Sequence, residues 1–192
     1  MFAETGSKDE IVDRLFTVFQ KRGFDGASLT ELSRATGLGK SSLYHHFPDG
    51  KAQMAQAVLD RATELIDSEI LQVAQASGSM KTRIRKIIAM LNQIYENGRA
   101  PCVLAGMATS TLAGDLQQGL RKAFGNWSEA IETLARESGM SPVRARHFAE
   151  DWIARLQGAL ILQAATGDTG VFTRALNSLL ELAKEGAAHD QV

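Results

Sequence analysis

The chain has few of the features that mark membrane, secreted or disordered proteins. Its 192 residues include one cysteine, Cys102, so no disulfide can form within a single copy, and a reducing cytoplasm is expected. No apolar run approaches the roughly 20 residues that cross a bilayer. The N-terminal stretch MFAETGSKDE lacks the basic start and apolar core of a signal peptide. We therefore expect a cytoplasmic protein that does not engage a membrane.

Proline and net charge are also scarce. There are three prolines, and 44% of the residues are hydrophobic, which is enough to build packed cores rather than a disordered chain. A net charge of −1 argues against indiscriminate binding of nucleic acid over the whole surface. One segment departs from this balance. Residues 32–48 contain no Asp or Glu but include Arg34, Lys40, His45 and His46.

Hydrophobic residues recur with helical spacing almost throughout, and no segment alternates with the period of a β-strand. The pattern predicts an all-α protein in two parts, with short helices and tight turns before residue 50 and longer helices after it. We expect an N-terminal three-helix domain over residues 1–50 and a helical domain over 51–192. The longer predicted helices cover about 51–74, 84–95, 116–134, 142–166 and 171–185, with a short segment around Met107.

Two short helices stand next to each other in SLTELSRATGLGKSSLYHHFPDGK, residues 28–51. Ser28 and Glu31 have the spacing of a capping box, which predicts the start of the first helix. Gly37 ends that helix, and the second covers Lys40–His46, since Pro48 cannot extend it. Two short helices joined by a glycine-containing turn are typical of a helix-turn-helix, whose second helix enters the major groove of DNA.

The second helix presents a polar arc, because positions 40, 41, 44 and 45 share one side. Ser41 and Ser42 are short enough to approach base edges, whereas Lys40, Tyr44 and His45 suit phosphate oxygens. Spacing alone also fits a plain helical hairpin whose polar residues face water. In either case the apolar side is expected to form a core from Ile11, Leu15, Phe19, Leu32, Ala35, Leu38, Leu43 and Phe47.

The order of residues in this stretch resembles the N-terminal domain of the TetR family of transcriptional regulators. Ser28 stands for the family's capping Thr, Gly37 for its turn glycine, and Leu43, Tyr44 and Phe47 match directly. The resemblance implies phosphate contacts by Tyr44, His45 and Lys51 and base-edge positions for Lys40, Ser41 and Ser42. The predicted DNA-binding residues are Ser28, Lys40, Ser41, Ser42, Tyr44, His45 and Lys51.

Three positions depart from the family pattern. Ser33 and Thr36 replace alanines, and Gly39 stands where a Ser commonly caps the recognition helix. Glycine is a weaker N-cap by a few tenths of a kcal/mol, roughly, so the fold is not affected. The missing hydroxyl removes one phosphate contact from the pattern.

The remainder of the chain resembles the family in architecture, and residues 100–131 are similar to its LmrA/YxaF-type subgroup. The resemblance implies a domain that binds a small molecule and a homodimer formed through the last two helices, about 142–166 and 171–185. The apolar stripes of those helices, which include Ile153, Leu160 and Phe172, could equally belong to the core of one chain. For a small apolar or aromatic inducer, the candidate pocket residues are Leu91, Tyr95, Cys102, Met107, Trp127, Ile131, Trp152 and Leu156, with Gln157 as a further polar group.

We therefore predict a ligand-responsive regulator that binds double-stranded DNA, as a repressor released from a palindromic operator by a small molecule. An activator of the same fold and a helical protein-interaction module are the alternatives. An enzyme is not expected, because Cys102 and His147 belong to no nucleophile, phosphate-loop or metal-binding motif. We expect no catalytic residues, cofactor or metal.

Overall fold

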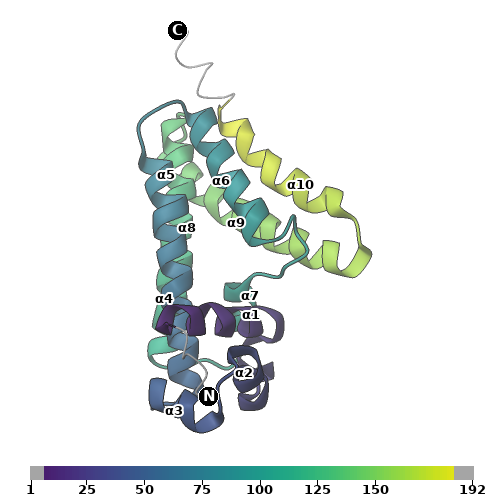
Figure 1. Cartoon of the computed structure of the whole chain (residues 1–192). Helices are drawn as coiled ribbons and strands as arrows, with labels where there is room; N and C mark the ends of the chain where they lie inside the picture. Colours follow the sequence, from purple (N-terminus) through teal and green to yellow (C-terminus); the bar gives the residue numbers. More distant parts are fainter. Residues whose placement is uncertain (1–6, 184–192) are drawn as a thin grey trace. The chain divides into compact units, whose positions relative to one another are not determined.

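The computed structural model describes residues 7–183, which are helical and contain no β-strand (Figure 1). The predicted all-α class is therefore confirmed. No helix within this range is both long and apolar enough to cross a membrane. The elements are α1 (Lys8–Gly26), α2 (Leu29–Thr36), α3 (Lys40–His46), α4 (Lys51–Ile66), the π-helical turn η1 (Asp67–Leu71), α5 (Gln72–Gln75), α6 (Met80–Ile94), α7 (Val103–Ala108), α8 (Asp115–Glu137), α9 (Pro142–Thr166), α10 (Thr169–Asn177) and the 3-10 turn η2 (Ser178–Glu181).

The helices form two compact units that are discontinuous in sequence. The first holds the described residues up to Glu64 together with Val103–Ala123, and the second holds Leu65–Cys102 and the described residues from Phe124 onward. By packing, α7 therefore belongs with the N-terminal helices. The predicted boundary at residue 50, between an N-terminal three-helix domain and a helical domain over 51–192, stays a prediction.

The predicted apolar side of the first three helices forms the core of the first unit. Leu15 and Phe19 of α1 are fully buried with Leu32 of α2. Ala35 is exposed, so its predicted place in the core is wrong. Thr36 is buried instead, because its hydroxyl donates to the Leu32 carbonyl at 2.8 Å and so satisfies its own polar group. The other predicted core residues, Ile11, Leu43 and Phe47, are buried, and Leu38 is half-buried.

The C-terminal turn of α1 is bound to α7 and the segment after it. Gly23 has φ +65°, which separates Phe24–Gly26 from the regular helix. The backbone N–H of Phe24 donates to the hydroxyl of Ser110 at 3.2 Å. The N–H of Thr111 donates to the carboxylate of Asp25 at 3.1 Å. Two hydrogen bonds therefore join a turn of α1 to a segment far away in sequence.

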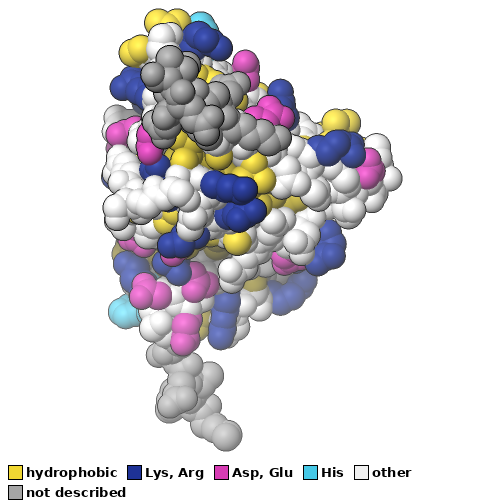
Figure 2. Space-filling model, turned by 90° about the horizontal axis from the view of Figure 1, so that it is seen from above, with side chains coloured by type: hydrophobic (Ala, Val, Ile, Leu, Met, Phe, Trp, Pro, Cys, Tyr) yellow, Lys and Arg dark blue, Asp and Glu magenta, His cyan; other side chains and the backbone are white. Residues whose placement is uncertain are grey.

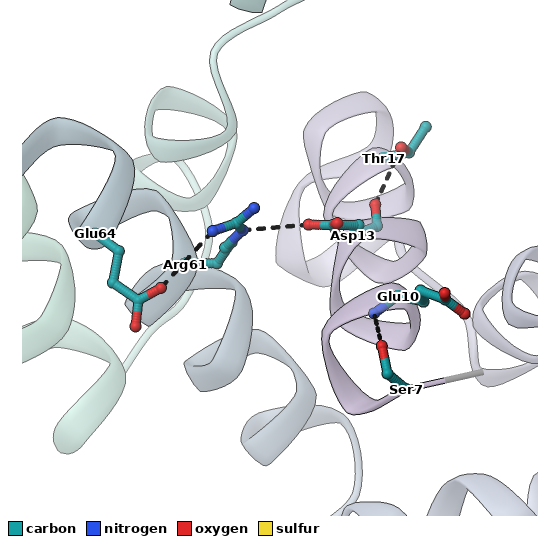
Figure 3. A network of polar contacts seen from close by, with 6 residues as sticks. All are labelled: Ser7, Glu10, Asp13, Thr17, Arg61 and Glu64. Atoms are coloured by element: carbon teal, nitrogen blue, oxygen red, sulfur yellow. Dashed lines mark hydrogen bonds and ion pairs between the residues drawn. The ribbon is translucent and has the colours of Figure 1, made fainter. Parts of the chain in front are cut away.

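A second link within this unit joins α1 to α4 (Figure 3). Asp13 of α1 pairs with Arg61 of α4 at 3.2 Å, and Arg61 also lies 3.9 Å from Glu64. Ser7 caps α1 by accepting from the N–H of Glu10 at 3.3 Å. The Asp13 and Arg61 side chains are about half exposed, so their pairing contributes on the order of 0.2–1 kcal/mol.

The second unit is a bundle built from the long helices. The stripe of α6 is buried as predicted, at Ile84, Ile87 and Leu91. In Figure 1, α9 and α10 run as an adjacent pair, and the indole N–H of Trp152 in α9 donates to the Ala175 carbonyl in α10 at 3.1 Å.

The apolar stripes of α9 and α10 lie within the core of one chain. Leu156, Leu160, Phe172, Leu176 and Leu179 are buried, and Ile153 is half-buried. The predicted bounds of α9, residues 142–166, are confirmed. The last helical segment begins at Thr169, and residues 184 and 185 of the predicted helix lie outside the described residues.

Candidate nucleic-acid interface

The first helix of the helix-turn-helix begins at the predicted capping box. The hydroxyl of Ser28 accepts from the N–H of Glu31 at 3.2 Å, and the N–H of Ser28 donates to the Glu31 carboxylate at 3.2 Å. The hydrogen bonds from Ser28 hold the pKa of Glu31 below its usual value, and the positive charges of Arg22 and Arg34 act in the same direction. The start of α2 is therefore fixed by reciprocal hydrogen bonds between Ser28 and Glu31.

The turn between α2 and α3 is held by a left-handed glycine and two side-chain hydrogen bonds. Gly37 adopts the left-handed conformation, with φ 72°, that ends α2. The guanidinium of Arg14 donates to the Thr36 carbonyl at 2.8 Å, and the hydroxyl of Ser33 donates to the Leu38 carbonyl at 2.5 Å. Ser33 and Thr36 replace alanines of the family pattern, and here both hydroxyls satisfy carbonyl groups around the turn.

Helix α3 buries one side and exposes the other. Leu43 is fully buried, whereas Lys40, Ser41, Tyr44 and His45 are exposed along the predicted arc. Ser42 is exposed as well. Gly39 occupies the N-cap and provides no side-chain hydrogen bond. The structure therefore brings five of the seven predicted DNA-binding residues together on one short helix.

The exposed ring of Tyr44 is positioned by the glycine that follows the helix. Tyr44 is 45% exposed, and a Cβ added to Gly50 would lie 3.2 Å from its Cε1 atom. Gly50 also has φ +66°, a conformation that favours glycine. The ring therefore rests against the backbone of the α3–α4 turn, and one side of it remains open.

Lys51, at the start of α4, has partners within the chain. Its ammonium donates to the Ala27 carbonyl at 3.0 Å and lies 4.6 Å from the centre of the Phe24 ring. These contacts of Lys51 with Phe24 and Ala27 were not predicted from the sequence. The signal that could have found Phe24 is an aromatic residue placed directly after the helix-ending Gly23, where it can cover a neighbouring cation.

Charge at α3 contrasts with charge elsewhere on the surface. The segment 32–48 carries cations and no carboxylate. The face seen from above in Figure 2 carries Lys and Arg side chains interspersed with Asp and Glu. A polyanion is therefore attracted to the helix-turn-helix more than to that mixed face.

All eight candidate pocket residues are buried: Leu91, Tyr95, Cys102, Trp127, Ile131, Trp152 and Leu156 in the second unit and Met107 in the first. The Tyr95 hydroxyl donates to the Cys102 thiol at 3.5 Å. Burial, followed by the nearby Cys102, raises the pKa of Tyr95 well above its usual value, so the phenol stays protonated. Its ring meets Phe172 edge to face at 6.0 Å.

The same unit contains buried polar atoms that have no hydrogen-bond partner. Among the described residues they include the indole N–H of Trp127, the amide oxygen of Gln163 and the Nε–H of Arg83. The amide of Gln157 instead lies within hydrogen-bonding reach of the Tyr95 hydroxyl. Gln163 was not predicted from the sequence as a candidate pocket residue. It is 5% exposed and donates to the Asn97 carbonyl at 3.1 Å, and a polar residue on the buried side of a helix was the available signal. Groups of this kind are the ones a ligand would satisfy.

Two family descriptions match the chain. Residues 11–58 match the bacterial regulatory proteins of the tetR family, and residues 76–178 match the C-terminal domain of LmrA/YxaF-like transcriptional regulators. The second match alone covers more than half of the chain, and together they span both units.

Individual proteins agree with these matches. The HTH-type transcriptional regulator LmrA of Bacillus subtilis is 24% identical over 160 residues, covering 81% of this chain and 85% of that protein. The negative transcriptional regulator IcaR of Staphylococcus aureus, named for the biofilm operon icaADBC, is 37% identical over 51 residues, 27% of each chain. The crystal structure of a TetR transcriptional regulator from Legionella pneumophila has a TM-score of 0.82 at 20% identity, over 94% of this chain and 98% of that one. The last likeness shows the fold.

Proposed function

Since the chain belongs to the TetR family of bacterial transcriptional regulators, with an LmrA/YxaF-like C-terminal domain, we propose that it is a repressor released from its operator by a small molecule. The observation that carries the proposal is the exposed arc of α3, where Lys40, Ser41, Tyr44 and His45 lie in a segment, residues 32–48, that contains no Asp or Glu. Repression is supported by the name of IcaR, a negative regulator. The proposal places the protein in the cytoplasm and includes no catalytic activity.

On DNA, α3 lies in the major groove. Ser41 and Ser42 face base edges, and Lys40, Tyr44 and His45 contact phosphate oxygens. Lys51 keeps its contact with Ala27 and has N–H groups left for a phosphate, because an ammonium has three donors. Ser28 caps α2 and directs the N-terminus of that helix toward the backbone of the duplex.

The repressor acts as a homodimer through its last two helices, and α9 carries a surface suited to that role. Ala154, Gly158, Ile161, Leu162 and Ala165 follow one another at helical spacing and form the α9 stripe. Ile161 is 69% exposed and Leu162 is 52% exposed, and no atom of the described residues lies within 4 Å of a Cβ added to Gly158. Small residues beside exposed apolar ones allow two helices to pack closely. A two-fold dimer then reads two half-sites of an inverted repeat.

Release by a ligand follows from the buried polar atoms of the second unit. A small, largely apolar or aromatic molecule that hydrogen-bonds Trp127 or Gln163 would bind one arrangement of the bundle more tightly than another. The dimer that binds this ligand holds its recognition helices at a spacing that no longer fits the operator. The Tyr95 hydroxyl, whose O–H donates to Cys102, offers its oxygen as a further acceptor for the same molecule.

The test is a selection from random duplex DNA with the purified protein, repeated with Tyr44→Ala and Tyr44→Phe. We expect an enriched inverted repeat for the wild type, loss of enrichment for Tyr44→Ala, and partial retention for Tyr44→Phe, which keeps the ring on Gly50. A reporter behind the recovered operator then distinguishes repression from activation. No enrichment from 50 to 200 mM salt, roughly the range over which phosphate contacts weaken, would refute the proposal if mass spectrometry shows a ligand-free protein.

A further inference from the structure

A groove of about 340 Å³ lies in the second unit, between the segment η1–α5 and the start of α6. On α6 the lining positions 79, 82, 83 and 86 have helical spacing and form one face. The groove is formed by Ser68, Gln72, Val73, Ala76, Ser77, Gly78, Ser79, Thr82, Arg83 and Lys86.

The lining has the composition of an anion site. It includes two cations, Arg83 and Lys86, and no Asp or Glu. Ser77, Ser79 and Thr82 add hydroxyl groups that can donate to oxyanions. Lys86 is exposed, so its ammonium is accessible at the edge of the groove.

Arg83 supplies an unpartnered donor at this groove. It is 5% exposed, and its two terminal nitrogens donate to the Ala74 carbonyl and to the Glu137 carboxylate. Its Nε–H is buried and has no acceptor among the described residues. A buried donor without a partner is unfavourable, whereas an oxyanion entering the groove would provide the acceptor.

The N-terminus of α6 adds partial positive charge at the same place. Ser79 caps the helix by accepting from the N–H of Thr82 at 3.3 Å. The N–H groups of Met80 and Lys81 precede the first hydrogen bonds of the helix and have no acceptor within it. Aligned peptide dipoles favour an anion at this end of a 15-residue helix. The opposite wall contains the π-helical turn Asp67–Leu71, a distortion that is frequent at functional sites.

We propose that this groove binds a phosphate group, either free phosphate or the phosphate of a small metabolite. Lys86 and the first turn of α6 hold the anion, and the Arg83 Nε–H donates to it. The groove is larger than one phosphate ion, which leaves room for a small organic group. This site is separate from the predicted pocket residues, none of which lines it, and it does not depend on the proposed repressor role.

The experiment is isothermal titration calorimetry of the full chain with inorganic phosphate and, separately, with glycerol phosphate. Chloride at equal ionic strength is the reference. We expect saturable binding that Lys86→Glu weakens by about tenfold or more, since a charged hydrogen bond is lost and an acidic side chain is introduced. Arg85→Glu is the matched control, because Arg85 is exposed on the same helix beyond its first turn and does not line the groove.

Binding by the wild type that is indistinguishable from chloride would overturn the proposal, and so would equal weakening by Arg85→Glu and Lys86→Glu. Tighter binding of glycerol phosphate than of inorganic phosphate identifies a metabolite site. Equal binding of the two identifies a site for free phosphate. Because none of these titrations contains DNA, their result is independent of whether the chain is a repressor.

Discussion

Gly23 of α1 and Gly106 of α7 meet backbone to backbone, so that a Cβ on Gly23 would lie 2.8 Å from the carbonyl oxygen of Gly106. Gly23 also has φ +65°, which L side chains rarely adopt. The close approach brings the end of α1 against the segment that carries Ser110, the acceptor for the N–H of Phe24. Because Phe24 in turn contacts Lys51 at the start of α4, the same glycine supports one part of the predicted DNA-binding surface.

Replacement of Gly23 by alanine is therefore expected to destabilise the protein. Backbone strain and the clash with Gly106 together should lower the free energy of unfolding by about 1–3 kcal/mol. Urea unfolding followed by circular dichroism measures the change. Gly125→Ala in α8 is the control, because nothing lies within 4 Å of its Cβ, and a gain of about 0.5–1 kcal/mol is expected there. Equal unfolding midpoints for the two variants would contradict the contact between Gly23 and Gly106.

The contrast between Gly37 and Gly23 shows how much of the fold could be predicted. The capping pair of Ser28 and Glu31 begins α2 and Gly37 ends it, and both could be predicted because the residues involved are close in sequence. The contact of Gly23 with Gly106 was not predicted, because helical periodicity says which side of α1 is apolar but not which distant helix covers it.

The candidate sites show the same limit. The exposed arc of α3 follows from helix geometry, so Lys40, Tyr44 and His45 were predicted to be exposed and are exposed. The contacts of Lys51 depend on how α1 and α4 pack, which no spacing in the sequence encodes. The stripes of α9 and α10 fitted a core or a dimer equally well, since a buried residue and an interface residue have the same apolar character.

The stability of the protein is expected to depend on pH through the carboxylate of Glu31, at the start of α2. The folded pKa of Glu31 lies below its usual value of 4.5, so the capping box stabilises the protein above that value and is lost as pH falls through the folded pKa. Glu31→Gln should therefore flatten the decrease in thermal stability between neutral pH and the acid range. Glu129→Gln, an exposed carboxylate of α8 with no capping role, is the comparison. A carboxyl titration by NMR with a midpoint for Glu31 at or above 4.5 would show that the capping contacts do not form in solution.

Lys40→Ala should weaken operator binding to a similar extent for all sequences. Lys40 is an exposed cation at the start of α3, and the loss of one phosphate contact should lower the slope of log affinity against log salt by about 1 per protomer. Fluorescence anisotropy at several salt concentrations measures the slope. Arg85→Ala removes a positive charge from an exposed position on α6 and should leave the slope unchanged. If Lys40→Ala instead changed the preference of the protein among operator sequences and left the salt slope unchanged, Lys40 would contact base edges rather than phosphates.

A substitution in the α9 stripe is expected to disrupt the dimer without unfolding the protomer. Ile161 is 69% exposed in the single chain, so a charged side chain at this position should barely change the stability of the protomer. In a dimer formed through the α9 stripe, the same charge would be buried against the partner helix, which is unfavourable. Ile161→Glu is therefore expected to shift the protein from dimer to monomer in light scattering, with unchanged helical content. Operator affinity should fall by at least about tenfold, because a monomer reads only one half-site.

Ala89→Glu places the same charge at an exposed position of α6 and should leave the dimer intact. A dimer that survives Ile161→Glu would exclude the α9 stripe as the interface.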